Sequence, residues 1–493
     1  MTRMVKASMR EMGALPRSLW VCAAVATINA LCWAVITPTF WVPDEPAHAG
    51  YAQHLAEAGE LPAVGTSSPE LGIGPSAELT AVYEQLPFGV EGQPSWSPAA
   101  DRRLSARLSG GPALSRSRPG QALNATNNPP LYYLLQVIPY RVLYNASFLD
   151  RLLAMRALSA LFAGLTVLFS FLFLRQLLPT RPWAWTVGAA TLAFQPVLGF
   201  IAGGVNNDGM VYALGAALLW SVARAFRTGL TPGTGALMGS ILALGLLTKV
   251  TMLALIPGLI VAAATMILRD ESKRVALKGA LVLSLTAGVP FAAWIVFKRI
   301  ATGLGTAPAG GVVSSSATNG LDGVRDQLGY MWQAVFPRLP FMNDQFPHYV
   351  PWDVYFQGFV GRFGWFEFGF PTAWYWVALV IFAIGLALVV RALSRHRAAL
   401  RTRWPEGLAY LALFLGVLLA VEVAAYSYHL QADVFFEQAR YLFPVLPLYS
   451  AFVALAAIGA GPRSERAVGA LIVVIAMGHS LFSQLLTISR FYL

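Results

Sequence analysis

The sequence is poor in charged residues and in cysteine. Asp, Glu, Lys and Arg make up 12% of its 493 residues, whereas soluble globular domains carry about 25%. Its two cysteines, Cys22 and Cys32, both lie in the first apolar run, so they form no disulfide framework. These shortages exclude a water-soluble globular domain and a disulfide-stabilised secreted scaffold.

Signature motifs of several enzyme classes are also missing. The chain has no GxxxxGK[ST] loop, no CxxC pair, no HExxH helix and no GxSxG elbow. Nucleotide hydrolysis, structural zinc and serine-hydrolase chemistry therefore lack support. The net charge of +11 comes mostly from short connections between apolar runs. Membrane orientation explains that pattern better than a nucleic-acid partner, and we predict no nucleic-acid binding.

Long apolar runs make up most of the chain. The mean hydropathy is +0.58, and runs such as residues 19–37 and 377–393 approach the roughly 20 residues needed to cross a bilayer. We predict an all-α polytopic membrane protein, with a bundle of about 11–13 transmembrane helices in the plasma (inner) membrane. The lipid bilayer is thus its first partner.

Basic residues predict which connections face the cytoplasm. Arginine-rich connections occur at residues 175–182, 224–229, 269–274, 391–403 and 462–466. The chain then divides into five parts: the N-terminus and first transmembrane helix (1–37), a first extracytoplasmic loop with an interfacial helix (38–128), transmembrane helices (129–297), an aromatic-rich extracytoplasmic loop (298–370) and the C-terminal transmembrane helices (371–493).

Two adjacent apolar segments conflict with this alternation. Only an odd number of crossings fits between residues 128 and 175, yet both 129–144 and 152–174 are apolar. We interpret 129–144, which carries Pro139 and Arg141, as interfacial or re-entrant, and 152–174 as a full span. About 11 crossings result, with the C-terminus outside. The outer loop at 63–128 is rich in Gly, Pro and Ser, so part of it is expected to be mobile.

The motif PDEPAH follows the first span and presents Asp44 and Glu45. Pro46 suits the first position of an interfacial helix that ends at Gly59. The two acids either cap this helix or act in catalysis. In the catalytic case, Asp44 is a general base whose pKa is raised by burial and by Glu45. His48, one turn later, either has a structural role or orients the base, assists it or shares a metal with it.

Two further motifs place polar side chains on the same side. GGVNND contributes Asn207 and Asp208 at the start of a span, and NATNNPP contributes Asn127 and Asn128 before another helix. Each group either caps the helix that follows or forms part of a polar substrate wall.

Cations stand at this boundary too. Lys249 is one of only five lysines, and Arg440 lies in EQARYLF beside Gln438. Both either snorkel to the interface or bind phosphate, for which Arg offers a planar fork and Lys a point charge. We include Gln438 and Glu367 as substrate contacts. Glu422, inside a span, is a functional candidate or pairs with a nearby cation.

As a set, PDEPAH, NNPPLYYLL, GGVNND, LLTKVTMLALIP and QARYLFPVLPLYSAF resemble the GT-C superfamily of polytopic membrane glycosyltransferases. The similarity is to protein O-mannosyltransferases and lipid A aminoarabinose transferases, and most of all to a branch of bacterial membrane proteins with PDEPxH. It implies a GT-C-like fold. It also implies transfer of a sugar, with inversion, from a polyprenyl-phosphate-linked donor to an extracytoplasmic acceptor: a cell-envelope glycan, a lipid or a protein.

The resemblance implies roles for individual residues. Asp44, and Glu45 less directly, match the acid that acts as base or positions the acceptor, and Asp208 matches a second outer acid. Relatives often carry His or Lys where this chain has Asn127 and Asn128, so Lys249 and Arg440 must supply the phosphate contact. No organic cofactor is implied, and a divalent cation is left open.

Two other classes of function fit the spans. A transporter or flippase for a lipid-linked or small polar solute is the main alternative. Transporters commonly place ionisable groups near the midplane, however, and only Glu422 lies deep in a span here. A noncatalytic scaffold would leave Asp44, Asp208, Lys249 and Arg440 on one side by chance.

Overall fold

The computed structural model describes residues 15–61, 128–302, 320–432 and 437–493, together with residue 435 and isolated positions between 76 and 125. Most of the first outer loop, including Asn127, lies outside the described residues. The predicted mobility of residues 63–128 concerns the same part of the chain. The described part is almost wholly helical. Its strands, β1 (Arg362–Phe363) and β2 (Phe368–Gly369), form one short antiparallel hairpin. The prediction of an all-α polytopic membrane protein is confirmed.

In chain order the helices are α2 (Arg17–Ile36), α3 (Glu45–Ala58), α6 (Leu131–Val142), α7 (Phe148–Leu177), α8 (Pro182–Ala193), α9 (Pro196–Ala202), α10 (Asp208–Thr228), α11 (Pro232–Leu246), η3 (Val250–Leu255), α12 (Ile256–Arg269), α13 (Lys273–Thr302), α15 (Gly320–Gln333), η4 (Pro351–Phe356), α16 (Gln357–Gly361), α17 (Thr372–Arg395), α18 (Arg397–Thr402), α19 (Trp404–Ala432), η5 (Ala439–Val445), α20 (Leu446–Gly459) and α21 (Glu465–Tyr492).

Among the described residues, nine helices are long and apolar enough to cross a membrane. The pair α8 and α9, bent by 58°, is either a broken tenth span or a re-entrant loop, and α11 is a shorter apolar helix. The described residues therefore contain nine or ten candidate spans, against the roughly 11 crossings predicted for the whole chain. The helix α6 is only 12 residues long and packs against α3, while α7 is a full span of 30 residues. The structure therefore supports α7 as a full span, and the interfacial position of α6 stays a prediction.

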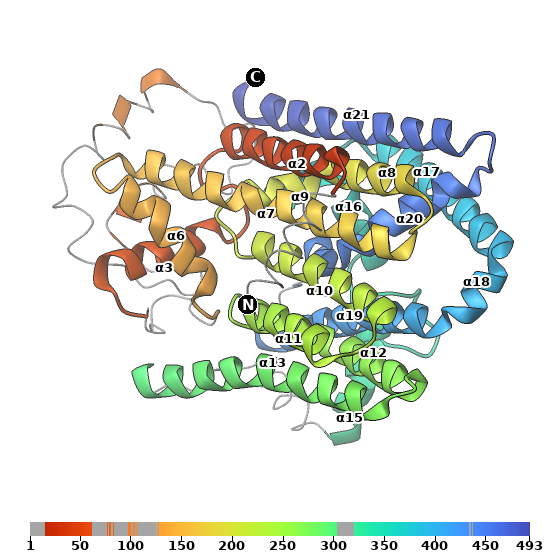
Figure 1. Cartoon of the computed structure of the whole chain (residues 1–493). Helices are drawn as coiled ribbons and strands as arrows, with labels where there is room; N and C mark the ends of the chain where they lie inside the picture. The colour runs from red at the N-terminus through yellow and green to blue at the C-terminus, as the bar shows by residue number, and fades with distance from the viewer. Residues whose placement is uncertain are drawn as a thin grey trace.

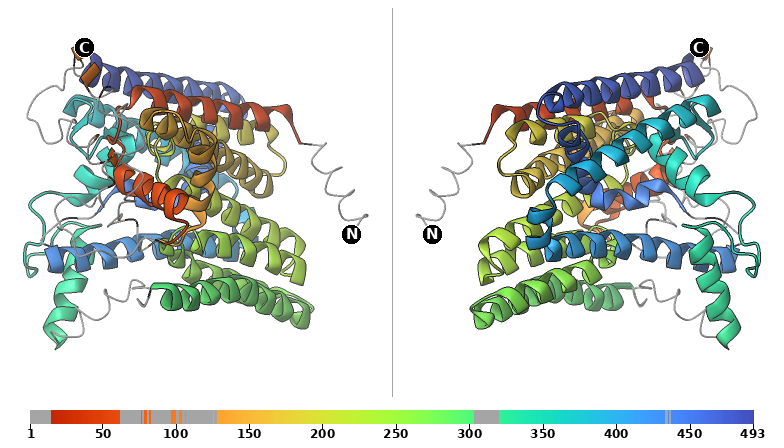
Figure 2. Two further views of the ribbon diagram at one scale, coloured as in Figure 1. Left: turned by 90° about the vertical axis from the view of Figure 1, so that its left-hand side faces the viewer. Right: turned by 90° about the vertical axis from the view of Figure 1, so that its right-hand side faces the viewer.

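The spans run side by side, with α7, α10 and α20 at the centre (Figure 1). The helices α13 and α21 form opposite edges of the bundle (Figure 2). In the apolar windows of α13 and α17 only 11% of residues are buried within the protein, against 78% in α10, so α13 and α17 face lipid. The helices α3 and α6 lie at one end of the bundle and α18 at the other (Figure 1).

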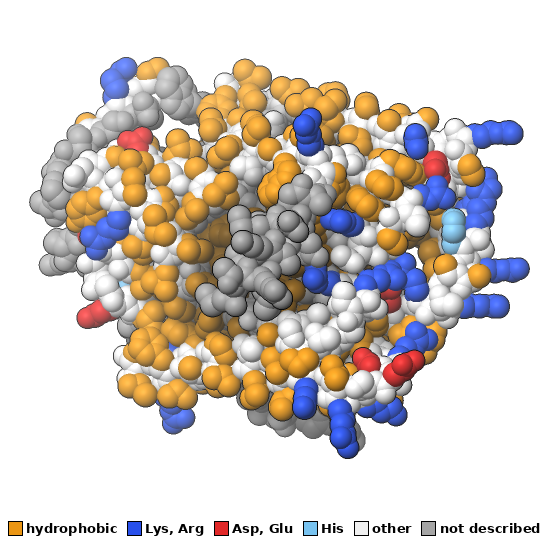
Figure 3. Space-filling model, in the orientation of Figure 1, with side chains coloured by type: hydrophobic (Ala, Val, Ile, Leu, Met, Phe, Trp, Pro, Cys, Tyr) orange, Lys and Arg blue, Asp and Glu red, His pale blue; other side chains and the backbone are white. Residues whose placement is uncertain are grey.

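The basic residues gather at the α18 end. Figure 3 shows most Lys and Arg side chains of the visible face at that end of the molecule. Its connections are those between α7 and α8, α10 and α11, α12 and α13, α17 and α19, and α20 and α21. The predicted alternation of basic and non-basic connections therefore corresponds to the two physical ends of the bundle.

Arg156 of α7 fastens the chain where it leaves α2. Its guanidinium donates hydrogen bonds to the backbone oxygens of Ala34, Thr37 and Pro38, at 2.9, 2.7 and 3.0 Å. The last carbonyls of a helix have no partner within the helix, so a buried helix end needs such a donor. The end of α2 is thus held in place by a side chain from a neighbouring span.

The same arginine holds Glu45, the first residue of α3. Arg156 Nε and Nη2 donate to the two carboxylate oxygens of Glu45 at 2.7 and 2.6 Å. Glu45 also accepts the backbone N–H groups of Phe40 and Val205, and its side chain is fully buried. The loop between α2 and α3 is therefore fixed from both ends.

The first prediction concerns stability. Arg156→Met leaves the buried carboxylate of Glu45 without its cation, so we expect a loss of roughly 3–5 kcal/mol in the free energy of unfolding. Thermal unfolding of the purified protein in one detergent measures it. Arg181→Met is the matched control, because Arg181 pairs with Glu465 while 36% exposed, and such pairs contribute roughly 0–1 kcal/mol. Equal losses in both variants would contradict the role of Arg156.

The second prediction concerns topology. In a background without Cys22 and Cys32, single cysteines replace the exposed residues Glu60 and Ser464 at opposite ends of the bundle. We expect a membrane-impermeant maleimide to label Glu60→Cys only from outside and Ser464→Cys only from the cytoplasm, because the basic connections face inward. Labelling of both from the same side would refute this orientation.

Candidate functional site

Four charged side chains from four separate segments meet at the α3 end of the bundle. Arg440 Nη2 lies 2.7 Å from Asp44 Oδ2, and Arg440 Nη1 lies 3.6 Å from Asp208 Oδ2. Lys249 Nζ lies 2.5 Å from Asp208 Oδ1. We call Asp44, Asp208, Lys249 and Arg440 the charged cluster. The sequence predicted that these residues share one boundary, and the structure brings them into contact.

Asp44 reaches the cluster because of its backbone conformation. With φ 64° it occupies the left-handed region, which Asp tolerates better than most residues. Its side chain makes no capping hydrogen bond to α3 and points to Arg440 instead. The alternative that Asp44 caps the helix is therefore wrong.

A buried asparagine aligns Asp208 with the loop that carries Asp44. Asn206 donates from its side-chain amide to the backbone oxygen of Pro43 at 2.9 Å, and its Oδ1 accepts the backbone N–H of Asp208 at 2.8 Å. The residue before α10, Asn207, makes no side-chain capping bond. The turn at residues 203–208 thus connects the two acidic segments, as the polar-wall interpretation requires.

Arg440 lies in η5, which packs unusually close to α10. A Cβ added to Gly215 of α10 would lie 2.3 Å from the backbone oxygen of Pro444, so only glycine permits this approach. The side chain of Arg440 is 4% exposed. Among the described residues its Nε and Nη1 have no hydrogen-bond partner, and neither has Asp208 Oδ2. The cluster therefore has unused hydrogen-bonding capacity.

Tyr441 covers the cations from one side. Its ring centroid lies 5.0 Å from Arg440 Cζ and 5.5 Å from Lys249 Nζ, and Arg440 donates to its hydroxyl at 3.2 Å. An aromatic face attracts cations without neutralising them. Both cations therefore contact an aromatic face in addition to the carboxylates of the cluster.

A cavity of about 70 Å³ opens beside the cluster. Asp208, Lys249 and Arg440 are among its lining residues. Most of the remaining lining is apolar, and α19 contributes Val417, Ala420, Val421 and Ala424 to it. Charged and apolar side chains thus line the same space.

Tyr133 of α6 links the remaining polar candidates. Its hydroxyl lies 2.8 Å from His48 Nδ1 and accepts from the side-chain amides of Asn128 and Asn207 at 3.3 and 3.4 Å. Its ring stacks on Tyr51 with the centroids 3.8 Å apart. The structure therefore brings His48, Asn128 and Asn207 together around Tyr133. This tyrosine lies in the motif NNPPLYYLL, but the sequence did not predict it as a site residue.

The electrostatics of the cluster differ from those predicted. Burial is the largest single influence and would raise the pKa of Asp44, but the nearby positive charges, that of Arg440 first, together with the hydrogen bond from Arg440 outweigh burial, so the pKa of Asp44 is lowered. The prediction that burial and Glu45 raise it is wrong, because the charge of Glu45 is compensated by Arg156. Burial lowers the pKa of His48 to about 4, so His48 is neutral at physiological pH.

The other predicted site residues have different surroundings. Glu45 lies in the Arg156 contacts described above. Gln438 borders a small void of about 10 Å³ beside Arg440, and its buried Oε1 has no partner among the described residues. Glu367 is exposed in the turn between β1 and β2, where the cation that acts on it is Arg490. Glu367 is thus not part of the charged cluster.

Glu422 is buried in α19 and accepts a hydrogen bond from Tyr355, so its partner is a hydroxyl and not a cation.

Within the described ranges, no group of three or more His, Cys, Asp or Glu side chains is placed to hold a metal ion. Between Asp44 and Asp208 stands the guanidinium of Arg440, where a shared metal would have to lie.

Comparison with known proteins gives a family and a set of similar structures. No curated protein matches the chain. The archaeal oligosaccharyltransferase AglB from Archaeoglobus fulgidus, solved in complex with an inhibitory peptide and a dolichol-phosphate, is similar at 14% identity and a TM-score of 0.48. That match covers 96% of this chain and 56% of AglB. The apo form of the Archaeoglobus fulgidus oligosaccharyltransferase is similar at 13% identity and a TM-score of 0.45, with 96% and 56% covered.

This chain therefore spans little more than half the length of those oligosaccharyltransferases. A family model described as "Predicted membrane protein (DUF2142)" matches residues 28–449, which is most of the sequence. The chain belongs to the DUF2142 family of predicted membrane proteins.

Proposed function

We propose that this protein is a membrane glycosyltransferase that moves a sugar from a polyprenyl-phosphate donor to an acceptor on the extracytoplasmic side. The observation that carries the proposal is the charged cluster, three of whose residues, Asp208, Lys249 and Arg440, line a cavity together with apolar residues of α19. The motifs that resemble GT-C glycosyltransferases contribute all four residues of the cluster, which supports the same class of reaction.

Arg440 and Lys249 are the donor-phosphate ligands in this proposal. Among the described residues, two nitrogens of Arg440, Nε and Nη1, have no hydrogen-bond partner, and Lys249 is 17% exposed beside the cavity. A phosphodiester offers oxygens that suit both a guanidinium and an ammonium group. The isoprenoid chain would follow the apolar wall of α19, so the donor enters from the bilayer and the acceptor from the aqueous side.

Asp44 is the base in this proposal. The acceptor hydroxyl attacks the anomeric carbon, its proton passes to Asp44, and the bond between that carbon and the phosphate oxygen breaks. Arg440 and Lys249 stabilise the negative charge left on the polyprenyl phosphate. One displacement inverts the anomeric centre.

Phosphate binding also makes Asp44 a better base. In the structure Arg440 holds the pKa of Asp44 down. A phosphate that draws on the same guanidinium would weaken the contact between Arg440 and Asp44 and raise the basicity of the carboxylate. The base is thereby activated when the donor is in place.

The third prediction tests the phosphate site. Arg440→Gln removes a charge-assisted hydrogen-bond donor, which is worth roughly 1.5–3 kcal/mol, so we expect the Kd for polyprenyl phosphate to rise about tenfold to 100-fold. Titration in nanodiscs measures it. Arg269→Gln, at the opposite end of the bundle, is the matched control and should bind as the wild type does. Wild-type affinity in Arg440→Gln would exclude Arg440 from the site.

The fourth prediction tests the base. Asp44→Asn retains the side-chain shape and tolerates the left-handed backbone, but it cannot accept the proton. We expect sugar transfer to fall about 100-fold or more while polyprenyl-phosphate binding is retained. Transfer kinetics beside the binding titration separate the two effects.

The control for that experiment is Glu45→Gln. Because Glu45 is bound to Arg156, this variant should lose thermal stability more than it loses rate per folded molecule. A folded Asp44→Asn protein that transfers sugar at the wild-type rate would show that the carboxylate is not the base.

A further inference from the structure

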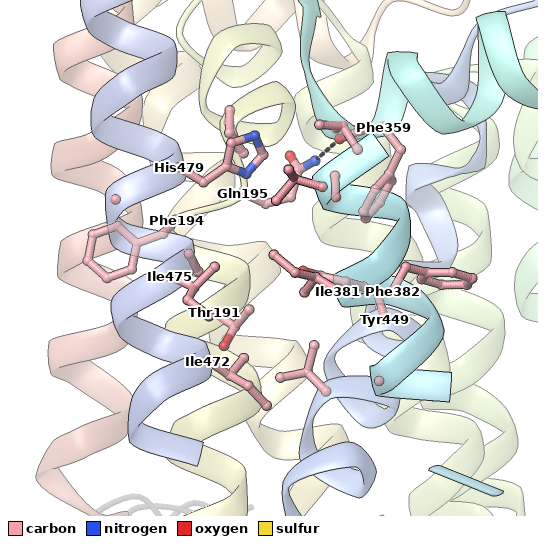
Figure 4. Close-up of a pocket in the computed structure, with 18 of the residues that line it drawn as sticks. Thr191, Phe194, Gln195, Phe359, Ile381, Phe382, Tyr449, Ile472, Ile475 and His479 are labelled. Atoms are coloured by element: carbon pink, nitrogen blue, oxygen red, sulfur yellow. Dashed lines mark hydrogen bonds between the residues drawn. The ribbon is translucent and has the colours of Figure 1, made fainter. Parts of the chain in front are cut away.

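A second and larger cavity, of about 490 Å³, lies between α8, α9, α16, α17, α20 and α21. Figure 4 shows Ile472 and Ile475 of α21 on one side of it and Ile381 and Phe382 of α17 on the other. The volume is in the range of about 300–1,000 Å³ that small-ligand sites occupy. Neither the motifs nor the proposed reaction accounts for this cavity.

The cavity opens onto the surface that faces lipid. Part of its lining is exposed there: Val377, Ile381 and Phe382 of α17, and Ile475 and Phe482 of α21, are each 41–56% exposed. Other lining residues, such as Thr191 and Val453, are only 2% and 5% exposed. The cavity thus runs inward from the lipid-facing surface of two spans. A ligand at that depth arrives from the bilayer.

The polar side chains Gln195 and Thr191 in the cavity wall already have hydrogen-bond partners within the protein. Gln195 uses both ends of its amide within the protein: its Oε1 accepts from the backbone of Leu198 at 2.6 Å, and its Nε2 donates to the backbone of Phe359 at 2.8 Å. The hydroxyl of Thr191 donates to the backbone of Val187 at 2.8 Å. Water finds few hydrogen-bond partners on such a wall, whereas a hydrocarbon chain needs none.

We propose that this cavity binds one hydrocarbon chain of a bilayer lipid. The occupant follows from three observations: the lining is apolar, the opening is continuous with the lipid-facing surface, and the position is within the membrane-spanning part of α17, α20 and α21. One polar atom, His479 Nε2, is buried at the Gln195 end without a hydrogen-bond partner among the described residues. It is available to an ester or hydroxyl oxygen of the lipid.

This site is separate from the cavity beside the charged cluster. Phe359 of α16 lines the large cavity, and its ring packs against Phe443 of η5 with the centroids 5.8 Å apart. Phe443 follows Arg440 by one turn of the 3₁₀-helix, a rise of roughly 6 Å. One layer of aromatic side chains therefore stands between the lipid-chain site and the charged cluster. The lipid-chain site goes beyond the proposed function and does not depend on it.

Photocrosslinking tests the proposal directly. The full-length protein is placed in nanodiscs that contain phosphatidylglycerol with a diazirine on one acyl chain, then irradiated, and the adducts are mapped by mass spectrometry. We expect adducts on Thr191 and Val453, which lipid around the outside of the bundle cannot reach because both are buried. Adducts only on the exposed faces of α17 and α21 would overturn the proposal.

Cavity-filling variants give the matched comparison. A Cβ added to Gly478, which lines the cavity, meets no atom within 4 Å, so Gly478→Leu fills the space without a clash at the Cβ position. We expect the adducts on Thr191 and Val453 to fall by about fivefold or more, because the leucine side chain and a lipid chain cannot occupy the same space; such a fall corresponds to about 1 kcal/mol of binding free energy. Gly288→Leu in α13 is the control, because Gly288 also has open space around it but does not border the cavity.

A second filling variant guards against a folding defect. Ala378→Phe enters the cavity from α17, the opposite wall, and should reduce the same adducts. If Thr191 and Val453 are labelled equally in the wild type and in both folded filling variants, the proposal is wrong.

Discussion

Charge compensation in a low-dielectric setting determines how the α3 end of this protein is built. Asp44, Asp208, Lys249 and Arg440 carry two negative and two positive charges, and their side chains are between 4% and 29% exposed. An isolated ion so far from water costs several kcal/mol, and breaking such a pair leaves the other partner uncompensated. The four residues come from the α2–α3 loop, α10, the start of η3 and η5, so the chain of ion pairs from Asp44 through Arg440 and Asp208 to Lys249 ties these four segments together.

The same constraint operates one layer away, on α7. This span carries two buried arginines, Arg151 and Arg156, that face the α3 end of the bundle. Arg156 binds Glu45, and Arg151 forms an ion pair with Glu78 and donates to the Tyr140 hydroxyl at 2.6 Å. A single rigid helix thus anchors two acidic residues of the first outer loop. These contacts fix the positions of the residues around the charged cluster before any ligand binds.

Much of this arrangement was predictable from the sequence, for identifiable reasons. Hydrophobic runs and arginine-rich connections predicted the spans and their alternation because a bilayer imposes both. That alternation placed Asp44, Asp208, Lys249 and Arg440 at one boundary, since each borders an apolar run on the side without arginines. The contacts among them could not be derived, because they depend on how α10 and η5 pack.

The residues that were misjudged or missed depend on tertiary contacts. Glu45 looked like a partner for Asp44 because the two are adjacent, but a left-handed residue between loop and helix sends their side chains to different arginines. Arg156 was detectable as an ionisable residue inside an apolar run, which is a functional or structural signal by default. Tyr133 carried no such signal, because a buried tyrosine in a helix reads as core until its hydroxyl contacts are known.

The most direct test of the account is an experimental structure of the protein with polyprenyl phosphate bound in nanodiscs. The account predicts the phosphate within hydrogen-bond distance of both Arg440 and Lys249, the isoprenoid chain along the apolar wall of α19, and Asp44 no longer held by Arg440 alone. A phosphate bound elsewhere on the protein, with the contacts of Asp44 and Asp208 to Arg440 and Lys249 unchanged, would contradict it.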